Sequence, residues 1–281
     1  MNWKNWTITV FSFLMTASSR AQFQPGQENL PLQFTESRIT RGDFADFEVD
    51  ALDNLYVITR DYQLKKYGPK GDSISVWNDV RAYGNPTMLD VSNPLRILLY
   101  YKPFATIVIL DRFLAFRHSI NLRKAGIFKV NTVVNSYDNN IWLFDEQDLR
   151  LKKMDDEGNV LFETTDWRML FETAPSPFKI IDHENSVYVF DEASGWYVFD
   201  YYGSLKKRLS VSGWKIIGKN KDFMYGFSNN LLHTAELPDL KIRDYVMPAR
   251  INDRDNIRIM NGRAYWLQPD GVHIYKIENR K

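Results

Sequence analysis

A unit of about 40 residues recurs along this chain, and it limits the possible folds more than any single residue does. The clearest copy begins with a polar turn at residues 138–140 and continues with an apolar strand at residues 141–145. A second strand at residues 149–154 then leads into a turn that ends at Gly158. Short apolar runs between tight polar turns are typical of antiparallel strands. The unit is therefore predicted to be a meander of short strands.

The pattern can be followed through six consecutive units. The expected strands lie at residues 45–50, 55–58, 64–67 and 73–77; 87–91, 95–101, 106–110 and 113–118; 132–135, 141–145, 149–154 and 160–162; 178–182, 186–190, 196–199 and 205–209; 214–217, 223–227, 231–235 and 240–246; and 256–260, 263–267 and 272–276. The sixth unit is one strand short. An alternating segment at residues 32–40 has no hairpin partner beside it and can supply the missing strand.

Four-stranded units of this length are typical of propeller blades, and closing them into a ring removes the exposed edges of a linear stack. A solenoid is the alternative, but its repeats are usually shorter or helical. The second strands, such as residues 141–144, are almost continuously apolar, which predicts burial on both faces between neighbouring blades. The sequence therefore predicts an all-β, six-bladed β-propeller that is closed by an N-terminal strand.

Residues 1–21 are predicted to be a secretory signal peptide rather than part of the folded domain. Lys4 supplies a basic start, residues 8–15 form an apolar core, and small residues end at Ala21. A buried N-terminal strand is the alternative. Residues 22–31 are polar and contain proline, so we expect a flexible segment there and a single propeller domain over residues 32–281.

The composition limits which cellular compartment and which classes of partner are compatible with this chain. A net charge of +1 gives no field that would attract nucleic acid. The chain has no cysteine, which excludes a disulfide framework and a lipid-anchored N-terminal Cys. No later apolar run reaches the roughly 20 residues of a membrane span, so no transmembrane segment is expected after signal removal. An exported bacterial protein, periplasmic or associated with the outer membrane, fits these features.

Three of the units share a more detailed pattern. It consists of an Asp/Asn-Asn turn, an apolar strand with an aromatic residue, a gap, Arg/Gln-Leu before an aromatic residue or Met, and a turn with Gly. It is best seen at residues 53–71, 138–158 and 185–203. This pattern resembles the repeat of NHL-type and related six-bladed β-propellers. Other units depart from it, with Pro94 or Gly262 where the Asn turn is expected. The resemblance implies the fold and says little about activity.

Motifs for catalysis are absent from the sequence, which has no G-x-S-x-G elbow, P-loop or G-x-G-x-x-G. A metal site would need several histidines to converge, yet the four fall in different units. They are His118, His183, His233 and His273. We therefore predict no catalytic residue, no metal site and no cofactor.

Acids and amides recur after the first strand of most units. They are Asp50, Asp90, Asn135, Asp182 and Asn220. A ring of such groups could hold Ca²⁺ at the channel mouth, as the resemblance to propeller lactonases and esterases implies. Asp and Asn also form turns by bonding to their own backbone, and recurrence in most of the units favours that structural role.

Aromatic residues in turns are the remaining candidates for function, because Trp and Tyr carry much of the energy at protein interfaces. Packing between blades is their alternative role. The set is Trp77, Tyr83, Trp167, Tyr201, Tyr202 and Trp214. The long connection at residues 166–177 is the strongest candidate, since binding residues concentrate on such connections. The predicted partner-binding residues are Trp167, Met169, Leu170, Phe171, Tyr201 and Tyr202.

These features favour a non-enzymatic, exported propeller that binds a protein partner in a cell-envelope complex. The chain resembles accessory subunits of outer-membrane complexes, including the plug-like partner of the type 9 secretion translocon. That resemblance implies a large outer-membrane protein as partner. Two alternatives remain: a Ca²⁺-dependent lactonase, esterase or sugar lyase at the channel, and a carbohydrate-binding module that uses exposed aromatic residues.

Overall fold

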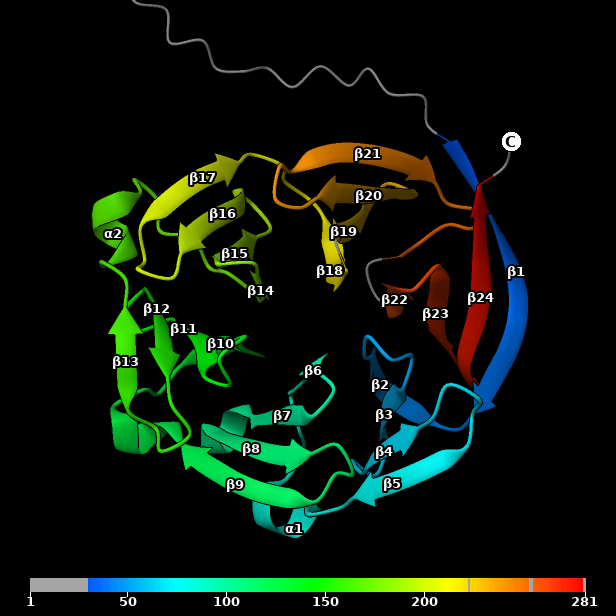
Figure 1. The fold of residues 1–281 in the computed structure, drawn as a ribbon, viewed down its shortest axis with the longest axis horizontal. Coiled ribbons are helices and arrows are strands. Elements are labelled where there is room, and N and C mark those ends of the chain that lie inside the picture. Colours follow the sequence, from blue (N-terminus) through cyan, green and yellow to red (C-terminus); the bar gives the residue numbers. More distant parts are fainter. Residues whose placement is uncertain (1–29, 222, 253–254, 280–281) are drawn as a thin grey trace, which may run out of the picture.

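A computed structural model describes residues 30–221, 223–252 and 255–279. Strands dominate it, and they form sheets that are arranged in a ring around a central axis (Figure 1). Two short α-helices, α1 (Val80–Tyr83) and α2 (Trp167–Leu170), lie on the outside of the ring. In the described part of the chain, no helix is both long and apolar enough to cross a membrane. The predicted signal peptide lies outside the described residues.

Four of the sheets are antiparallel meanders of four strands. The first contains β2 (Phe44–Val49), β3 (Leu55–Thr59), β4 (Leu64–Tyr67) and β5 (Ser73–Trp77), and the second β6 (Met88–Asn93), β7 (Arg96–Tyr101), β8 (Thr106–Asp111) and β9 (Phe116–Asn121). The third contains β10 (Val130–Asn135), β11 (Ile141–Asp145), β12 (Arg150–Met154) and β13 (Val160–Glu163). The fourth contains β14 (Lys179–His183), β15 (Ser186–Asp191), β16 (Gly195–Asp200) and β17 (Leu205–Leu209).

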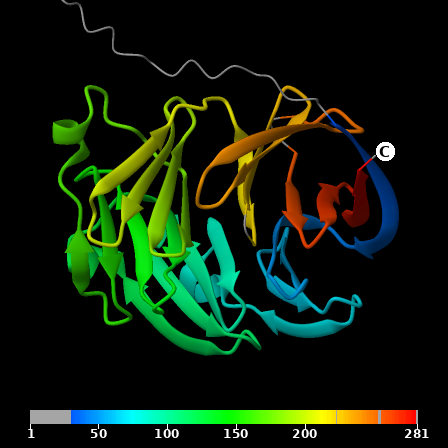
Figure 2. The same cartoon turned by 45° about the horizontal axis from the view of Figure 1, so that its top comes forward.

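The remaining strands form one sheet of eight, in the order β18-β19-β20-β21-β1-β24-β23-β22. Its strands are β18 (Lys215–Asn220), β19 (Phe223–Ser228), β20 (Leu231–Glu236), β21 (Lys241–Val246), β22 (Ile257–Met260), β23 (Arg263–Gln268), β24 (Gly271–Asn279) and β1 (Leu30–Arg41). β1 pairs antiparallel with β24 from Leu32 to Arg41, as Figure 2 illustrates at the rim of the ring. It meets β21 only at Leu30 and Pro31, in parallel.

The strands predicted from the sequence are present with bounds that differ by a few residues. The predicted pairing of the N-terminal strand with the end of the chain is also present. β1 begins at Leu30, two residues before the predicted strand, and residues 30 and 31 pair with β21. β9 begins at Phe116 because residues 112–115 form the turn that precedes it.

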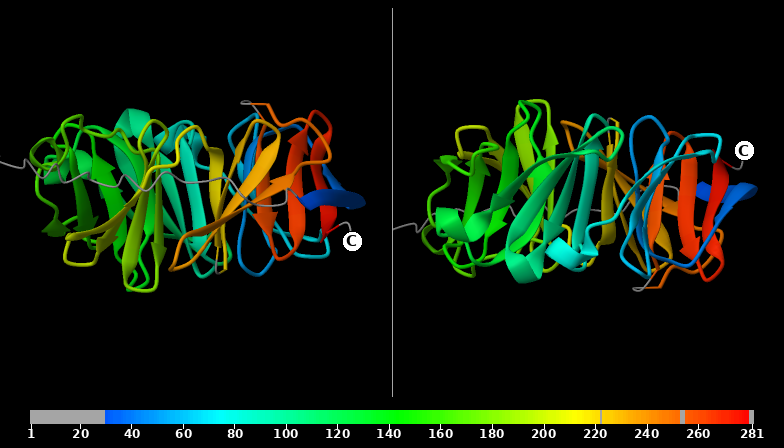
Figure 3. Two further views of the ribbon diagram at one scale, coloured as in Figure 1. Left: turned by 90° about the horizontal axis from the view of Figure 1, so that it is seen from above. Right: turned by 90° about the horizontal axis from the view of Figure 1, so that it is seen from below.

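Because the strands of each sheet alternate in direction, the connections emerge on two opposite faces of the disc (Figure 3). One face carries the turns between first and second strands and between third and fourth strands; we call it the turn face. The other carries the turns between second and third strands and the connections from one sheet to the next; we call it the crossover face. Connections on such rigid scaffolds are where binding residues concentrate.

The core consists of apolar layers between successive sheets. Every residue of β3, β7 and β11 is buried, as predicted for strands covered on both faces. Between the third and fourth sheets, Trp142 and Phe144 pack with Val187 and Phe199. Large aromatic residues fill the wedge between sheets, each burying about 150–250 Å².

Candidate functional site

The structure divides the predicted partner-binding residues between the two faces. Trp167, Met169, Leu170 and Phe171 belong to the connection between β13 and β14, on the crossover face. Tyr201 and Tyr202 lie in the turn between β16 and β17, on the turn face. Both groups adjoin the boundary between the third and fourth sheets. They therefore form two separate surfaces.

Trp167 fixes the short helix α2 to the ring. Its side chain is fully buried, and its ring centroid lies 5.2 Å from that of Phe199 and 4.7 Å from that of Phe144. Its indole N–H donates to the Thr164 hydroxyl at 3.1 Å, and its backbone N–H donates to the Leu149 carbonyl at 2.9 Å. Trp167 therefore anchors α2, and its side chain has no exposed surface to offer a partner.

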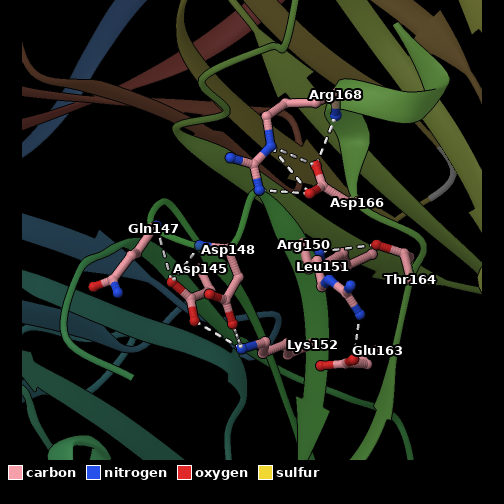
Figure 4. Close-up of polar contacts among 10 residues, drawn as sticks. All are labelled: Asp145, Gln147, Asp148, Arg150, Leu151, Lys152, Glu163, Thr164, Asp166 and Arg168. Atoms are coloured by element: carbon pink, nitrogen blue, oxygen red, sulfur yellow. Dashed lines mark hydrogen bonds and ion pairs between the residues drawn. The ribbon is translucent and has the colours of Figure 1, made fainter. Parts of the chain in front are cut away.

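Charged side chains stiffen the base of α2 (Figure 4). The Lys152 ammonium lies between Asp145 and Asp148, at 2.8 and 2.5 Å, with only 7 % of its side chain exposed. These carboxylates raise the pKa of Lys152 against the opposing effect of burial. Asp166 caps α2 by accepting a hydrogen bond from the backbone N–H of Arg168 at 2.9 Å. Ion pairs and a capping hydrogen bond therefore hold the base of α2 in place.

Above this base, α2 presents apolar side chains to solvent. Met169 is 80 % exposed and Leu170 is 42 % exposed, whereas Phe171 is half-buried against Tyr197 and Trp167. Met169 and Leu170 can therefore contact a partner directly, while Phe171 mainly supports them.

On the turn face, two tyrosines from neighbouring sheets stack on each other. The Tyr137 and Tyr201 rings are 4.9 Å apart with an angle of 5° between their planes. The Lys153 ammonium lies between 5.1 and 5.4 Å from the ring centroids of Tyr137, Trp142 and Tyr201. It also forms an ion pair with Asp138 at 2.6 Å. The three rings thus enclose a cation of the same chain, which holds the stack in place.

Asp182 at the end of β14 anchors this stack from below. It accepts hydrogen bonds from the Tyr201 hydroxyl at 2.6 Å and from the Trp142 indole N–H at 3.0 Å. The Ser136 hydroxyl also donates to it at 2.8 Å. Burial and the adjacent Asp182 carboxylate raise the pKa of Tyr201 well above its usual value. Tyr201 therefore stays neutral, and its hydroxyl donates a hydrogen bond to Asp182.

Next to the stack, Tyr202 projects into solvent. Tyr202 is 86 % exposed and Tyr137 is 67 % exposed. The turn that carries Tyr202 is fixed by Asp200, whose carboxylate accepts from the N–H groups of Tyr202 and Ser204 at 3.0 and 2.9 Å. We call Tyr137, Tyr201 and Tyr202 the tyrosine platform. Tyr137 was not singled out from the sequence, although it is also an aromatic residue in a turn.

The other turn aromatics have packing roles. Trp214 is buried, with 3 % of its surface exposed, and stacks on His233. Trp77 is half-buried and stacks on Phe116, and Tyr83 packs against Tyr101.

The recurrent acids and amides hold turns and neighbouring sheets together. The Asp50 carboxylate is buried and accepts from the N–H groups of Leu52 and Asn54 within its own turn. Asn135 reaches the preceding sheet, where its side-chain amide donates to Asp90 at 2.7 Å. These contacts agree with the structural role that the repeat indicated. In the described residues, no group of three His, Cys, Asp or Glu side chains could hold a metal ion.

The centre of the ring contains a cavity of about 100 Å³. An ion pair of 2.8 Å between Arg258 and Glu48 lies in its wall, and Lys179 is nearby. Arg258 and Lys179 lower the pKa of Glu48 despite its burial. Opposite charges thus neutralise each other in the channel.

Comparison with known proteins identifies the fold. No family model matches the chain, and no curated protein matches it. The structure of virginiamycin B lyase from Staphylococcus aureus with quinupristin is 13 % identical, with a TM-score of 0.57 over 88 % of this chain and 89 % of that chain. The Cps50 (Swd1) β-propeller domain of Myceliophteria thermophila is 9 % identical, with a TM-score of 0.58 over 87 % and 99 %. BBS1N in complex with ARL6DN is 12 % identical, with a TM-score of 0.55 over 89 % and 86 %.

These similarities confirm the predicted β-propeller fold. The three proteins differ in what their names say that they do, and one fold supports many functions. At such low identity, activity does not follow from the likeness.

Proposed function

We propose that this chain is an exported six-bladed β-propeller that serves as a rigid protein-binding subunit of a cell-envelope complex. The observation that carries the proposal is the tyrosine platform, in which exposed Tyr137 is held by stacking on Tyr201 and exposed Tyr202 projects beside it. Aromatic side chains that are fixed before binding lose little conformational entropy when a partner covers them.

The strands that line the central cavity support the proposal of six blades. Residues from β2, β6, β10, β14, β18 and β22 all line it. The eight-stranded sheet then counts as two blades. One blade contains β18 to β21, and the other contains β22 to β24 together with β1. The two blades are joined where Leu30 and Pro31 of β1 pair with β21. On this reading the N-terminal strand closes the last blade.

The proposal that the protein is exported rests on its sequence. We propose that residues 1–21 are a signal peptide, that the segment after it leads to β1, and that residues 32–281 form one propeller domain. The absence of cysteine agrees with a fold that is stabilised by its core in a bacterial envelope. A large outer-membrane protein, such as the channel of a protein secretion translocon, is the proposed partner class.

The tyrosine platform suits a protein partner because its two exposed rings are held differently. Tyr137 is fixed by stacking on Tyr201, whereas Tyr202 is 86 % exposed on a hydrogen-bonded turn. A fixed ring and a projecting ring can together fill pockets on an opposing surface. Met169 and Leu170 form a second apolar surface on the other face, so a partner could be bound on both sides of the ring.

Affinity capture from detergent-solubilised envelopes tests the proposal. We expect the tagged protein to recover a partner in a fixed ratio, and the double substitution Tyr137→Ala and Tyr202→Ala to reduce that recovery at least tenfold. Phe113→Ala is the matched control, because Phe113 is 57 % exposed in the corresponding third-to-fourth-strand turn of another sheet. Equal recovery by the double variant and the wild-type protein would contradict the platform's role.

The same preparation separates the alternative functions. Bound calcium found by elemental analysis, with no recovered partner, would favour a hydrolase or lyase at the channel. Binding to envelope oligosaccharides that is lost in the Tyr137→Ala and Tyr202→Ala variant would favour a carbohydrate-binding module.

A further inference from the structure

Three polar side chains on neighbouring strands of the eight-stranded sheet form a continuous hydrogen-bonded chain. The Ser228 Oγ lies 2.6 Å from His233 Nε2, and His233 Nδ1 lies 2.7 Å from Asp244 Oδ1. The carboxylate accepts a hydrogen bond from the Nδ1–H group, so in the neutral imidazole Nε2 carries the lone pair and accepts a hydrogen bond from the Ser228 hydroxyl. A nucleophile, a base and a group that orients the base are thus joined in order.

Strand register brings these residues together. His233 on β20 lies opposite Gly226 on β19 and opposite Asp244 on β21. Ser228 is two residues beyond Gly226 on the same strand, so its side chain leaves the same surface of the sheet. Gly226 leaves space above the strand, and a Cβ atom there would come within 2.9 Å of the Trp214 ring.

The Trp214 ring covers the histidine. Its centroid is 5.1 Å from that of His233, and the two planes are 8° apart. His233 is only 8 % exposed as a result. The imidazole is therefore fixed in orientation, with Nε2 within hydrogen-bond reach of the Ser228 hydroxyl, as a general base must be.

A cavity adjoins the serine end of this chain. It has a volume of about 340 Å³ and lies on the crossover face. Ser228, Asn229 and Asn230 all line it, and the two asparagines form a two-residue hairpin turn with φ values of 48° and 68°. Ser228 thus stands at the wall of a space that can admit a small molecule, whereas His233 and Asp244 lie behind it.

The turn also supplies donors. Within the described part of the chain, the backbone N–H groups of Asn229 and Asn230 have no hydrogen-bond acceptor. The N–H of the residue after a serine nucleophile often stabilises the oxyanion of an acyl-transfer intermediate. Asn229 occupies that position relative to Ser228.

The alternative is that Ser228 and Asp244 only satisfy the hydrogen-bonding groups of a buried histidine. It would explain the two hydrogen bonds, but it would not require the serine to line a cavity. The combination of bonding order, shielding, cavity and donors goes beyond what packing needs.

We propose that Ser228 is the nucleophile of an acyl-ester hydrolase site on the crossover face, with His233 as its base and Asp244 as a positioning residue. Ser228 Oγ attacks the ester carbonyl carbon, and its proton passes to His233 Nε2. The ester C–O bond breaks, and the leaving alcohol takes the proton from His233. Water then attacks the acyl-serine with His233 again as base, which releases the carboxylic acid and restores the hydroxyl.

The cavity indicates a small ester with a polar group. Its lining includes Ser212, Lys215, Asn229 and Asn252 as well as the apolar Ile216 and Phe227. The site lies on another sheet from the tyrosine platform, so its test is independent of the proposed partner binding.

Labelling with a fluorophosphonate and hydrolysis of 4-nitrophenyl acetate test the inference on the full mature chain. We expect one label per molecule on Ser228, and Ser228→Ala to abolish labelling and lower the hydrolysis rate at least 100-fold. Ser73→Ala is the matched control, since Ser73 is an exposed serine on β5, in another sheet and away from this cavity, and it should react like the wild-type protein.

The substitution Asp244→Asn tests whether Asp244 orients His233 for catalysis or only stabilises the fold. It should lower kcat at least tenfold while KM stays within twofold, because the base is misoriented but the cavity is unchanged. A folded wild-type protein that takes no label on Ser228 would overturn the inference. Equal hydrolysis by Ser228→Ala, with an unchanged melting temperature, would also overturn it.

Discussion

His273 Nδ1 on the last strand lies 2.7 Å from Glu36 Oε2 on the first strand, so a hydrogen-bonded ion pair joins the two ends of the ring. The other ring nitrogen, Nε2, lies 2.8 Å from Asp270 Oδ1. Two carboxylates thus hold one imidazolium, and they raise the pKa of His273 although burial opposes this. Closure of the ring depends in part on that charge.

This arrangement predicts that stability falls as the pH rises. The folded pKa of His273 is above its unfolded value of about 6.5, so the contribution is fully present below that pH and is lost as pH rises through the folded pKa. We expect Glu36→Gln to lower the free energy of unfolding by about 1 kcal/mol at pH 5.5 and by less at pH 9. Urea unfolding at both pH values measures this, with His118→Gln as control because His118 is exposed. An equal loss at both pH values would contradict the assignment.

β1 itself is predicted to be essential for the fold. It covers the edge of β24 from Gly271 to Asn279, and an uncovered strand edge pairs readily with other chains. A chain that begins at residue 42 should therefore aggregate or form oligomers, whereas a chain that begins at residue 30 should stay monomeric. Size-exclusion chromatography with light scattering distinguishes them. A monomeric, cooperatively folded chain without β1 would show that closure is dispensable.

The strands were predictable because their signals are local. Polar turns and apolar runs fix each hairpin within a unit, and the missing strand of the last unit indicated where residues 32–40 would pair.

Exposure of individual side chains was not predictable, because it depends on contacts between units. Trp167 is buried by Phe144 and Phe199, which belong to two different sheets. The neighbouring Met169 is exposed for lack of such contacts. Likewise, Ser228, His233 and Asp244 meet only through the register of three strands, which a repeat pattern does not specify to one residue.

Burial of Trp167 leads to a stability prediction. Trp167→Ala should lower the free energy of unfolding by about 3–5 kcal/mol, because it leaves a cavity between two sheets. Met169→Ala on the same helix should change it by no more than about 0.5 kcal/mol, since Met169 is 80 % exposed. Denaturant unfolding measures both. Similar losses for the two variants would contradict the role of Trp167 as the anchor of α2.

The turn that carries Tyr202 contains Gly203, whose substitution can be compared with that of Gly126 elsewhere in the chain. Gly203 and Gly126 have the same φ of +75°, so an alanine at either position costs about 1–2 kcal/mol for the left-handed conformation. A Cβ at Gly203 would also lie 2.3 Å from the Phe162 ring, whereas a Cβ at Gly126 meets nothing within 4 Å.

We therefore expect Gly203→Ala to destabilise the protein more than Gly126→Ala, by a further 1–3 kcal/mol or so, because the Phe162 ring or the turn must move. Displacing the turn also shifts Tyr202 and Tyr201, so partner recovery should fall with Gly203→Ala and not with Gly126→Ala. Urea unfolding and affinity capture, carried out on the same preparations, measure the two effects. If Gly203→Ala lost stability but kept full recovery, the exact placement of the tyrosines would not matter for binding.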